Sequence, residues 1–222
     1  VAEIIDRYFS DKMVRVVILK SRQMGITTIL LALWVWFAIT IPGFTVFILI
    51  DKDTHLSKKM LMVEKWIKKA NSIDPDAFPS VAGKPAKSIV LSNGSIIMYD
   101  SAKSTNPGTS EMIRAGHYSE EPKWPKGRSA QIDASITPAI PETPGTILVN
   151  ESTAEGIDNG FYKRWKRCED GLDPETLALF LPWFMSEEYY REPPPECFNE
   201  LGEFIYHDDD DEISRKNAEG TV

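Results

Sequence analysis

Residues 14–28, VRVVILKSRQMGITT, constrain the fold most strongly, because a strand pattern, a glycine-containing turn and a helix pattern follow one another without a break. Residues 14–19 are mostly apolar and β-branched, which is typical of a strand buried on both faces. Gly25 permits a left-handed backbone, and residues 26–41 are apolar and compatible with a helix. Loop amides and a helix N-terminus in this order form an anion site, so the stretch predicts a phosphate-binding loop. The alternative is a polar strand-to-helix turn without a ligand.

The loop departs from the usual phosphate-loop pattern, G-x-x-x-x-G-K-[ST]. Gly25 takes the place of the second glycine and Thr27 that of the hydroxyl residue, but the lysine position holds Ile26 and the first glycine position holds Lys20. The chemistry needs a cation near the β- and γ-phosphates and a hydroxyl on Mg²⁺. We expect Lys20 to supply that cation from the other end of the loop, with Arg22 as a second donor.

Strand and helix patterns alternate along the rest of the chain. Asn93-Gly94 between two apolar runs predicts one β-hairpin. The alternation predicts an α/β fold of the P-loop NTPase type, with a mainly parallel central sheet flanked by helices and an inserted β-hairpin. We expect strands at 14–19, 44–50, 88–91, 95–99, 112–118, 146–150 and 177–183, and helices at 2–10, 26–41, 56–70, 129–136 and 160–168, with 73–87 irregular. The polar loops after Leu19, Tyr118 and Asn150 should then meet at one edge of the sheet.

Two of those loops carry residues suited to phosphate chemistry. An NTPase needs one carboxylate to hold Mg²⁺ and another to orient the attacking water. Ser119 occupies the place where P-loop motors usually have an aspartate, Glu120 follows it, and Glu121 is a candidate to compensate for the missing charge. The alternative is an exposed acidic turn. The second segment, 151–156 (ESTAEG), is expected to be a polar loop after a strand.

Three segments together resemble a known family. KSRQMGITT (20–28) looks like the Walker A segment of the large terminase subunit of tailed bacteriophages, the motor that packages DNA into procapsids. HYSEE (117–121) is similar to that family's catalytic segment, and ESTAEG (151–156) resembles its coupling motif. The motifs occur in the family's order, and the resemblance covers roughly residues 14–183.

The resemblance implies ATP and Mg²⁺ as cofactors and a role for each matched residue. Glu120 would activate water, and Arg22 would stabilise charge on the transferring phosphate. Thr27, Ser119 and Glu120 would hold the metal, while Ser152, Thr153 and Ala154 would sense the γ-phosphate. The nucleotide contacts would come from Lys20, Ser21, Arg22, Gln23, Met24, Gly25, Ile26, Thr27 and Thr28.

A ring ATPase often needs a further arginine to stabilise the transferring phosphate. Arg114 and Arg128 are candidates in cis or from a neighbouring subunit. An ordinary surface arginine is the alternative for each.

The resemblance also implies a biological role, which is to couple ATP hydrolysis to the translocation of double-stranded DNA into a procapsid in the cytoplasm of the infected bacterial host. The partners would be DNA, the portal protein and the small terminase subunit, with the chain in a homo-oligomeric ring on the portal or a monomer when isolated. No membrane is implied. Two rivals stay open. One is another nucleic-acid translocase. The other is a non-hydrolysing scaffold or DNA-binding module with a degenerate nucleotide site, which Ile26 and Ser119 favour.

Charge divides the chain into two parts. The net charge is −8, and the stretch from Met185 onward has 12 acidic and 3 basic residues, so the preceding part is close to neutral. We expect an ATPase domain at 1–184 and an acidic linker or tail at 185–222. In the family such a linker leads to a nuclease domain, which this sequence does not include, so we expect no DNA cleavage by this chain. The apolar run 26–41 is short for a membrane span and suits a buried helix.

Overall fold

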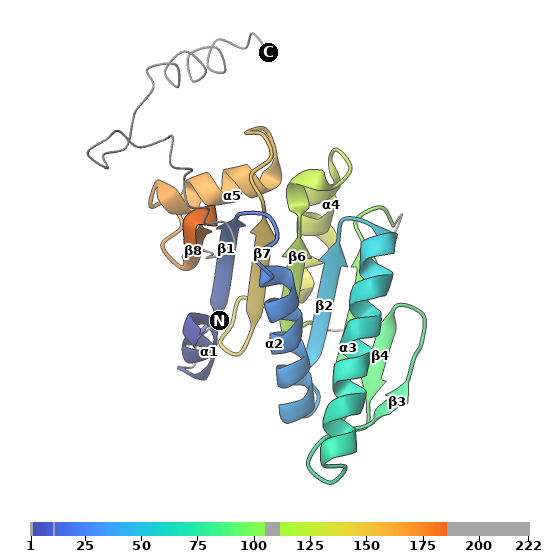
Figure 1. Ribbon diagram of the computed structural model, residues 1–222. Helices are drawn as coiled ribbons and strands as arrows, with labels where there is room; N and C mark the ends of the chain where they lie inside the picture. Colours follow the sequence, from blue (N-terminus) through green and yellow to red (C-terminus); the bar gives the residue numbers. More distant parts are fainter. Residues whose placement is uncertain (1, 11, 105–111, 186–222) are drawn as a thin grey trace, which may run out of the picture. The chain divides into compact units, whose positions relative to one another are not determined.

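The computed structural model describes residues 2–10, 12–104 and 112–185, shown in colour in Figure 1. All of these residues belong to the first of two units, Val1–Met185. The expected acidic tail, 185–222, lies outside the described residues except for Met185.

A sheet of eight strands in the order β3-β4-β5-β2-β6-β7-β1-β8 forms the centre of the described unit. The six strands from β5 to β8 in this order are parallel, whereas β3 and β4 pair antiparallel at one edge. This confirms the predicted mainly parallel sheet with an inserted hairpin. The strands are β1 (Val14–Lys20), β2 (Thr45–Ile50), β3 (Val81–Gly83), β4 (Ser88–Leu91), β5 (Ile96–Ser101), β6 (Ala115–Ser119), β7 (Ile147–Ser152) and β8 (Thr176–Leu181).

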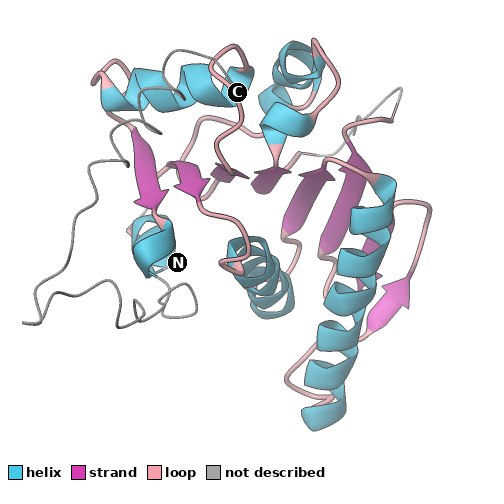
Figure 2. Ribbon diagram, turned by 45° about the horizontal axis from the view of Figure 1, so that its top comes forward, coloured by secondary structure: helices cyan, strands magenta, loops and turns pink. Residues whose placement is uncertain are grey.

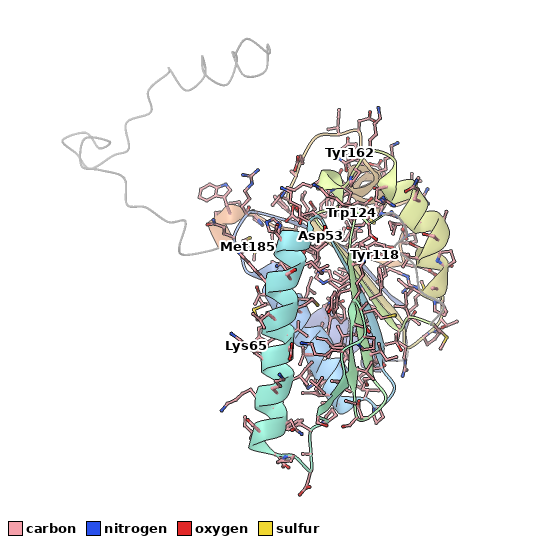
Figure 3. The ribbon with its side chains drawn as sticks, turned by 90° about the vertical axis from the view of Figure 1, so that its right-hand side faces the viewer. Asp53, Lys65, Tyr118, Trp124, Tyr162 and Met185 are labelled. Atoms are coloured by element: carbon pink, nitrogen blue, oxygen red, sulfur yellow. The ribbon has the colours of Figure 1, made fainter. Side chains whose placement is uncertain are left out.

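Helices cover both faces of the sheet (Figure 2). α1 (Ala2–Phe9), α2 (Ile26–Thr40) and α3 (Asp53–Ile73) share one apolar core, and α4 (Arg128–Ser135) packs into a second core on the other face, where α5 (Gly160–Glu169) also lies. Figure 3 shows Tyr118 and Trp124 near each other, with ring centroids 5.7 Å apart, while Lys65 projects away from the body. Among the described residues, no helix combines the length and apolarity that a membrane crossing requires.

Most element boundaries differ from those expected by one to three residues, and three differences are of more consequence. β7 continues through Ser152, so Glu151 and Ser152 lie in the strand and not in a polar loop. Pairing explains the extension, because β7 lies between β6 and β1, and Glu151 is in register with Ser119 on one side and Ile18 on the other. α3 begins at Asp53 and is longer than expected, and β3 forms inside a stretch expected to be irregular.

Candidate functional site

The candidate site lies at the carboxyl ends of the adjacent strands β6, β7 and β1, toward the top of Figure 1. Register brings its residues together. Ser119 of β6 pairs with Glu151 of β7, and Ser152 of β7 pairs with Leu19 of β1. Lys20, the last residue of β1, therefore emerges beside Glu151 although 131 positions separate them in the chain. The predicted convergence of the polar segments at one edge is confirmed.

The loop after β1 has the backbone of an anion-binding turn. Gln23 and Gly25 both have positive φ, 61° and 71°, and the second is a conformation that glycine adopts without strain. The backbone N–H of Ser21 donates to the carbonyl of Leu181, which fastens the loop to β8. α2 begins directly after Gly25, and no side chain caps its N-terminus. The first N–H groups of this 15-residue helix therefore face the loop without intrahelical acceptors.

Lys20 is the central cation of the site. Its side chain is almost fully buried, at 7% exposure, and its Nζ lies 2.9 Å from Glu120 Oε1 and 3.1 Å from Glu151 Oε2. Burial acts to lower the pKa of Lys20, but the two carboxylates outweigh it, so the pKa is raised. Lys20 is therefore a fixed positive charge at the mouth of the loop.

Glu151 is completely buried and accepts three hydrogen bonds on Oε1. The donors are Ser119 Oγ at 2.7 Å, Thr27 Oγ1 at 2.8 Å and His117 Nε2 at 3.3 Å. The indole N–H of Trp34 donates to His117 Nδ1 at 3.1 Å. Because an indole nitrogen only donates, Nδ1 must accept, and the imidazole proton sits on Nε2, directed at Glu151.

These donors keep Glu151 ionised. Burial acts to raise its pKa, but the hydrogen bonds from His117 and Ser119 and the Lys20 ammonium lower it to about 2. The second oxygen, Oε2, is buried and faces the Lys20 ammonium, with no further hydrogen-bond donor among the described residues.

Glu120 reaches the same cation from β6. Its backbone is left-handed, with φ 56°, which turns the side chain back over the strand end. Oε1 pairs with Lys20, and Oε2 lies 2.7 Å from Lys123 Nζ and 3.2 Å and 3.4 Å from the hydroxyls of Thr153 and Ser152. Burial acts to raise the pKa of Glu120, but the hydrogen bonds from Lys123 and Lys20 lower it.

Glu121 does not compensate for the uncharged Ser119. Its carboxylate is buried on the other side, where it accepts a hydrogen bond from Asn150 and pairs with Arg164 at 3.4 Å. Arg164 also pairs with Asp133 at 2.6 Å, so the network links the 3-10 turn Glu121–Lys123 with β7, α4 and α5. A Cβ at position 160 would collide with the Glu121 carboxylate and crowd Ser129, so glycine at this position permits the close approach. Glu121 therefore has a structural role, because it connects secondary-structure elements of the fold.

The other predicted residues fall into two groups. Ser21, Arg22 and Ala154 line an open depression of about 270 Å³ beside Lys20 and Thr153. Gln23, Met24, Gly25, Ile26 and Thr28 form the rest of the loop and the start of α2. Arg114, in contrast, precedes β6 at the opposite edge of the sheet, where it contacts Tyr8 and the Phe44 ring, so it takes no part in the site of its own chain.

The sequence alone does not single out Glu151. It stands beside the hydroxyl residues of the coupling-like segment, where an acidic residue suggests a solvated loop. The sequence signal beside Glu151 is the apolar run 146–150, which predicts a strand. In the structure this strand continues for two more residues, through Ser152. His117 is fully buried in β6, and its Nε2 donates to Glu151.

No family model matches this chain, and a search of curated proteins finds no match. Solved structures do match. The large terminase ATPase domain of Thermus phage P74-26 is 15% identical, with a TM-score of 0.59 over 75% of this chain and 75% of that one. The large terminase of bacteriophage HK97 is 13% identical, with a TM-score of 0.62 over 98% of this chain and 46% of that one. The large terminase of the thermophilic bacteriophage D6E, solved in complex with ADP, is 16% identical, with a TM-score of 0.53 over 78% of this chain and 41% of that one.

These similarities establish the fold. The chain has the P-loop NTPase-like architecture of phage large terminase ATPase domains, as its sequence motifs predicted. It spans less than half the length of the HK97 and D6E proteins.

Proposed function

We propose that this chain is the ATPase domain of a phage DNA-packaging terminase and that its site binds and hydrolyses ATP. One observation carries the proposal. A buried lysine, a helix-start threonine and two carboxylates converge beside a left-handed glycine loop and the uncapped N-terminus of α2. An anion is favoured at such a helix terminus, and the fixed Lys20 charge increases that preference.

The loop side of the site is suited to the phosphates. Lys20 and the first N–H groups of α2 offer positive charge and donors, and Arg22 lines the same depression. Arg22 is exposed, so its guanidinium is placed to stabilise charge on the transferring phosphate.

The oxygen donors around Thr27 fit Mg²⁺. Thr27, Ser119 and Glu151 gather hydroxyl and carboxylate oxygens within hydrogen-bond distance of one another, and hard cations prefer oxygen ligands. The described residues contain no cluster of three or more His, Cys, Asp or Glu side chains that would hold a metal by itself. That is compatible with Mg²⁺, which in phosphate sites uses one or two carboxylates plus the phosphates. When bound, Mg²⁺ neutralises charge that develops on the phosphates.

Glu120 is placed to orient the attacking water. Glu120 is ionised and directly follows the last residue of β6. Its carboxylate pairs with Lys20, the proposed phosphate-binding cation, and accepts hydrogen bonds from the hydroxyls of Ser152 and Thr153. A phosphate that engages Lys20 would compete with Glu120 for it, so Glu120 and the two hydroxyls respond together to the presence of the γ-phosphate. Ala154 follows them on the rim of the depression. This arrangement supports the coupling role proposed for Ser152, Thr153 and Ala154.

The wider role rests on the fold and on the motif resemblance. We propose that ATP hydrolysis here drives translocation of double-stranded DNA into a procapsid in the host cytoplasm. In this role the chain acts in a ring on the portal protein, together with a small terminase subunit. The basic lysines of α3 and α5 supply charge that suits a phosphate backbone.

The test is Mg²⁺-dependent ATP hydrolysis by the full 222-residue chain at high protein concentration, beside Lys20→Met and Glu120→Gln. We expect turnover that both substitutions abolish, while Glu120→Gln still binds ATP. Turnover unaffected by either substitution would contradict this site. ATP binding without turnover, even with DNA and assembled partners, would favour the non-hydrolysing scaffold, which the uncharged Ser119 and the engagement of Lys20 by two carboxylates support.

A further inference from the structure

The proposed function leaves one chemical role unfilled. P-loop motors place a carboxylate at the end of the strand that precedes the catalytic glutamate, where it holds the helix-start hydroxyl and the metal. In this chain that position is Ser119, which has no charge. The neighbouring strand brings a carboxylate to the same point, because Glu151 of β7 is in register with Ser119 of β6.

We propose that Glu151 is the metal-site carboxylate of this domain, moved from β6 to the adjacent strand β7. This inference rests on the proposed nucleotide site. It assigns Glu151 to the partnership with Thr27 and to the Mg²⁺ of the bound nucleotide, and it makes Ser119 a hydroxyl that supports Glu151.

The contacts of Glu151 carry the assignment. Oε1 accepts hydrogen bonds from the hydroxyl of Thr27 at 2.8 Å and that of Ser119 at 2.7 Å, so two of the three residues expected at the metal donate to this one carboxylate. Among the described residues, Oε2 faces only the Lys20 ammonium. Glu120 and Glu121 are differently engaged, the first with Lys123 and Thr153, the second with Arg164 and Asn150.

The surroundings of Glu151 indicate a positioned ligand. His117 donates to Glu151 through Nε2, and the hydrogen bond from Trp34 fixes the His117 ring. Hydrogen bonds of this kind hold a ligating carboxylate in one orientation. A fully buried carboxylate is costly unless it is paired and hydrogen-bonded. The only cation that Oε2 of Glu151 faces among the described residues is Lys20, so a metal ion that takes this oxygen replaces one cationic partner with another.

The test uses Mn²⁺ in place of Mg²⁺, because bound Mn²⁺ has an electron paramagnetic resonance signal. The full chain is titrated with Mn²⁺ at saturating non-hydrolysable ATP analogue, and ATP affinity is measured separately with and without Mg²⁺. For Glu151→Gln we expect Mn²⁺ affinity to fall about 10- to 100-fold, with metal-free nucleotide affinity retained. Glu155→Gln is the matched control, since Glu155 is exposed four residues further along, and its Mn²⁺ affinity should equal that of the wild type.

A second variant keeps the proposal testable if Glu151→Gln weakens the fold. Ser119→Asp combined with Glu151→Gln returns the carboxylate to β6, and we expect it to restore metal-dependent nucleotide binding. Failure of this double variant to recover that binding, or unchanged Mn²⁺ affinity in Glu151→Gln, would overturn the assignment to Glu151. Absence of nucleotide binding by the wild type would instead overturn the proposed function on which the inference rests.

Discussion

Two charge clusters of this molecule have opposite composition and differ in burial. At the candidate site one lysine, Lys20, pairs with Glu120 and Glu151. Between α3 and the stretch after β3, one glutamate, Glu64, pairs with Lys68 and Lys84. The side chains of these last two lysines are 64% and 52% exposed, whereas that of Lys20 is 7% exposed.

The difference in burial indicates which cluster is suited to bind a ligand. Ion pairs whose partners stay in water add little stability and are screened by salt, so the Glu64 cluster, in which Glu64 is covered but both lysines are exposed, costs less desolvation than the Lys20 cluster. The Lys20 cluster takes three charges out of water, and that desolvation is expensive. A chain that keeps such a cluster beside a phosphate-type loop has charges placed for a ligand. The two clusters therefore supply matched substitutions for separating function from stability.

The largest contrast is expected in turnover. Glu120→Gln removes the carboxylate proposed to orient the attacking water, so steady-state phosphate release at saturating ATP and Mg²⁺ should fall about 10²- to 10⁴-fold. Glu64→Gln makes the same chemical change in the Glu64 cluster and should leave the rate of phosphate release at the wild-type level. Equal rates in the two variants would remove Glu120 from the reaction.

A second contrast is expected in stability. Lys20→Met leaves Glu151 buried without its cation, and breaking a buried pair in this way costs about 3–5 kcal/mol. Lys84→Met changes an exposed partner of Glu64 and should leave the denaturation midpoint almost unchanged. Urea titrations of both variants provide the measurement, and a larger loss in Lys84→Met would reverse the interpretation of the clusters.

The contribution of Glu151 to the free energy of unfolding should depend on pH in the acid range. The pKa of Glu151 is about 2 in the folded chain against an ordinary 4.5, so below pH 4.5 the unfolded chain takes up a proton that the folded chain does not. The free energy of unfolding should therefore fall as the pH drops from 4.5 toward 2, and this contribution is fully present above 4.5. The fall should be shallower in Glu151→Gln. Denaturant titrations at several pH values measure it, and identical slopes in variant and wild type would contradict the pairing.

The smallest expected effect is the response to salt. At 1 M NaCl the screening length is about 3 Å, so the stability difference between wild type and Glu64→Gln should shrink. The difference between wild type and Glu151→Gln should persist, because Glu151 is fully buried. Paired titrations at low and high salt test this, and a Glu151 difference that vanished with salt would mean that water reaches the carboxylate.

Much of this fold could be predicted because local patterns and final structure agree. The run at 14–19, Gly25 and the apolar helix after it specify strand, turn and helix independently of distant contacts. Asn93-Gly94 likewise fixes the hairpin of β4 and β5. Lys20 and Thr27 are predicted site residues because both stand in that strand-turn-helix pattern, and Glu120 is predicted because it follows another strand pattern; their roles stay predictions.

Glu151 could not be chosen in this way, because its role depends on register. Nothing within a few residues of it indicates that β7 lies between β6 and β1, and that neighbourhood is what turns a polar segment into a strand end. The same holds for Glu121, whose sequence place beside Glu120 suggests chemistry but whose side chain is directed toward Asn150 and Arg164. β6 ends at Ser119, and the left-handed backbone of Glu120 leads into the 3-10 turn that begins at Glu121, so the two neighbouring side chains point in different directions.

The most direct test of the central claim is the binding of ATP to the full chain by titration calorimetry, with Lys20→Met and Lys84→Met measured in parallel. If Lys20 is the phosphate cation of a nucleotide site, the wild type and Lys84→Met should bind one ATP with equal affinity, and Lys20→Met should lose about 100-fold or more. No binding by the wild type, or equal binding by all three proteins, would contradict the assignment of this buried cluster to a nucleotide site.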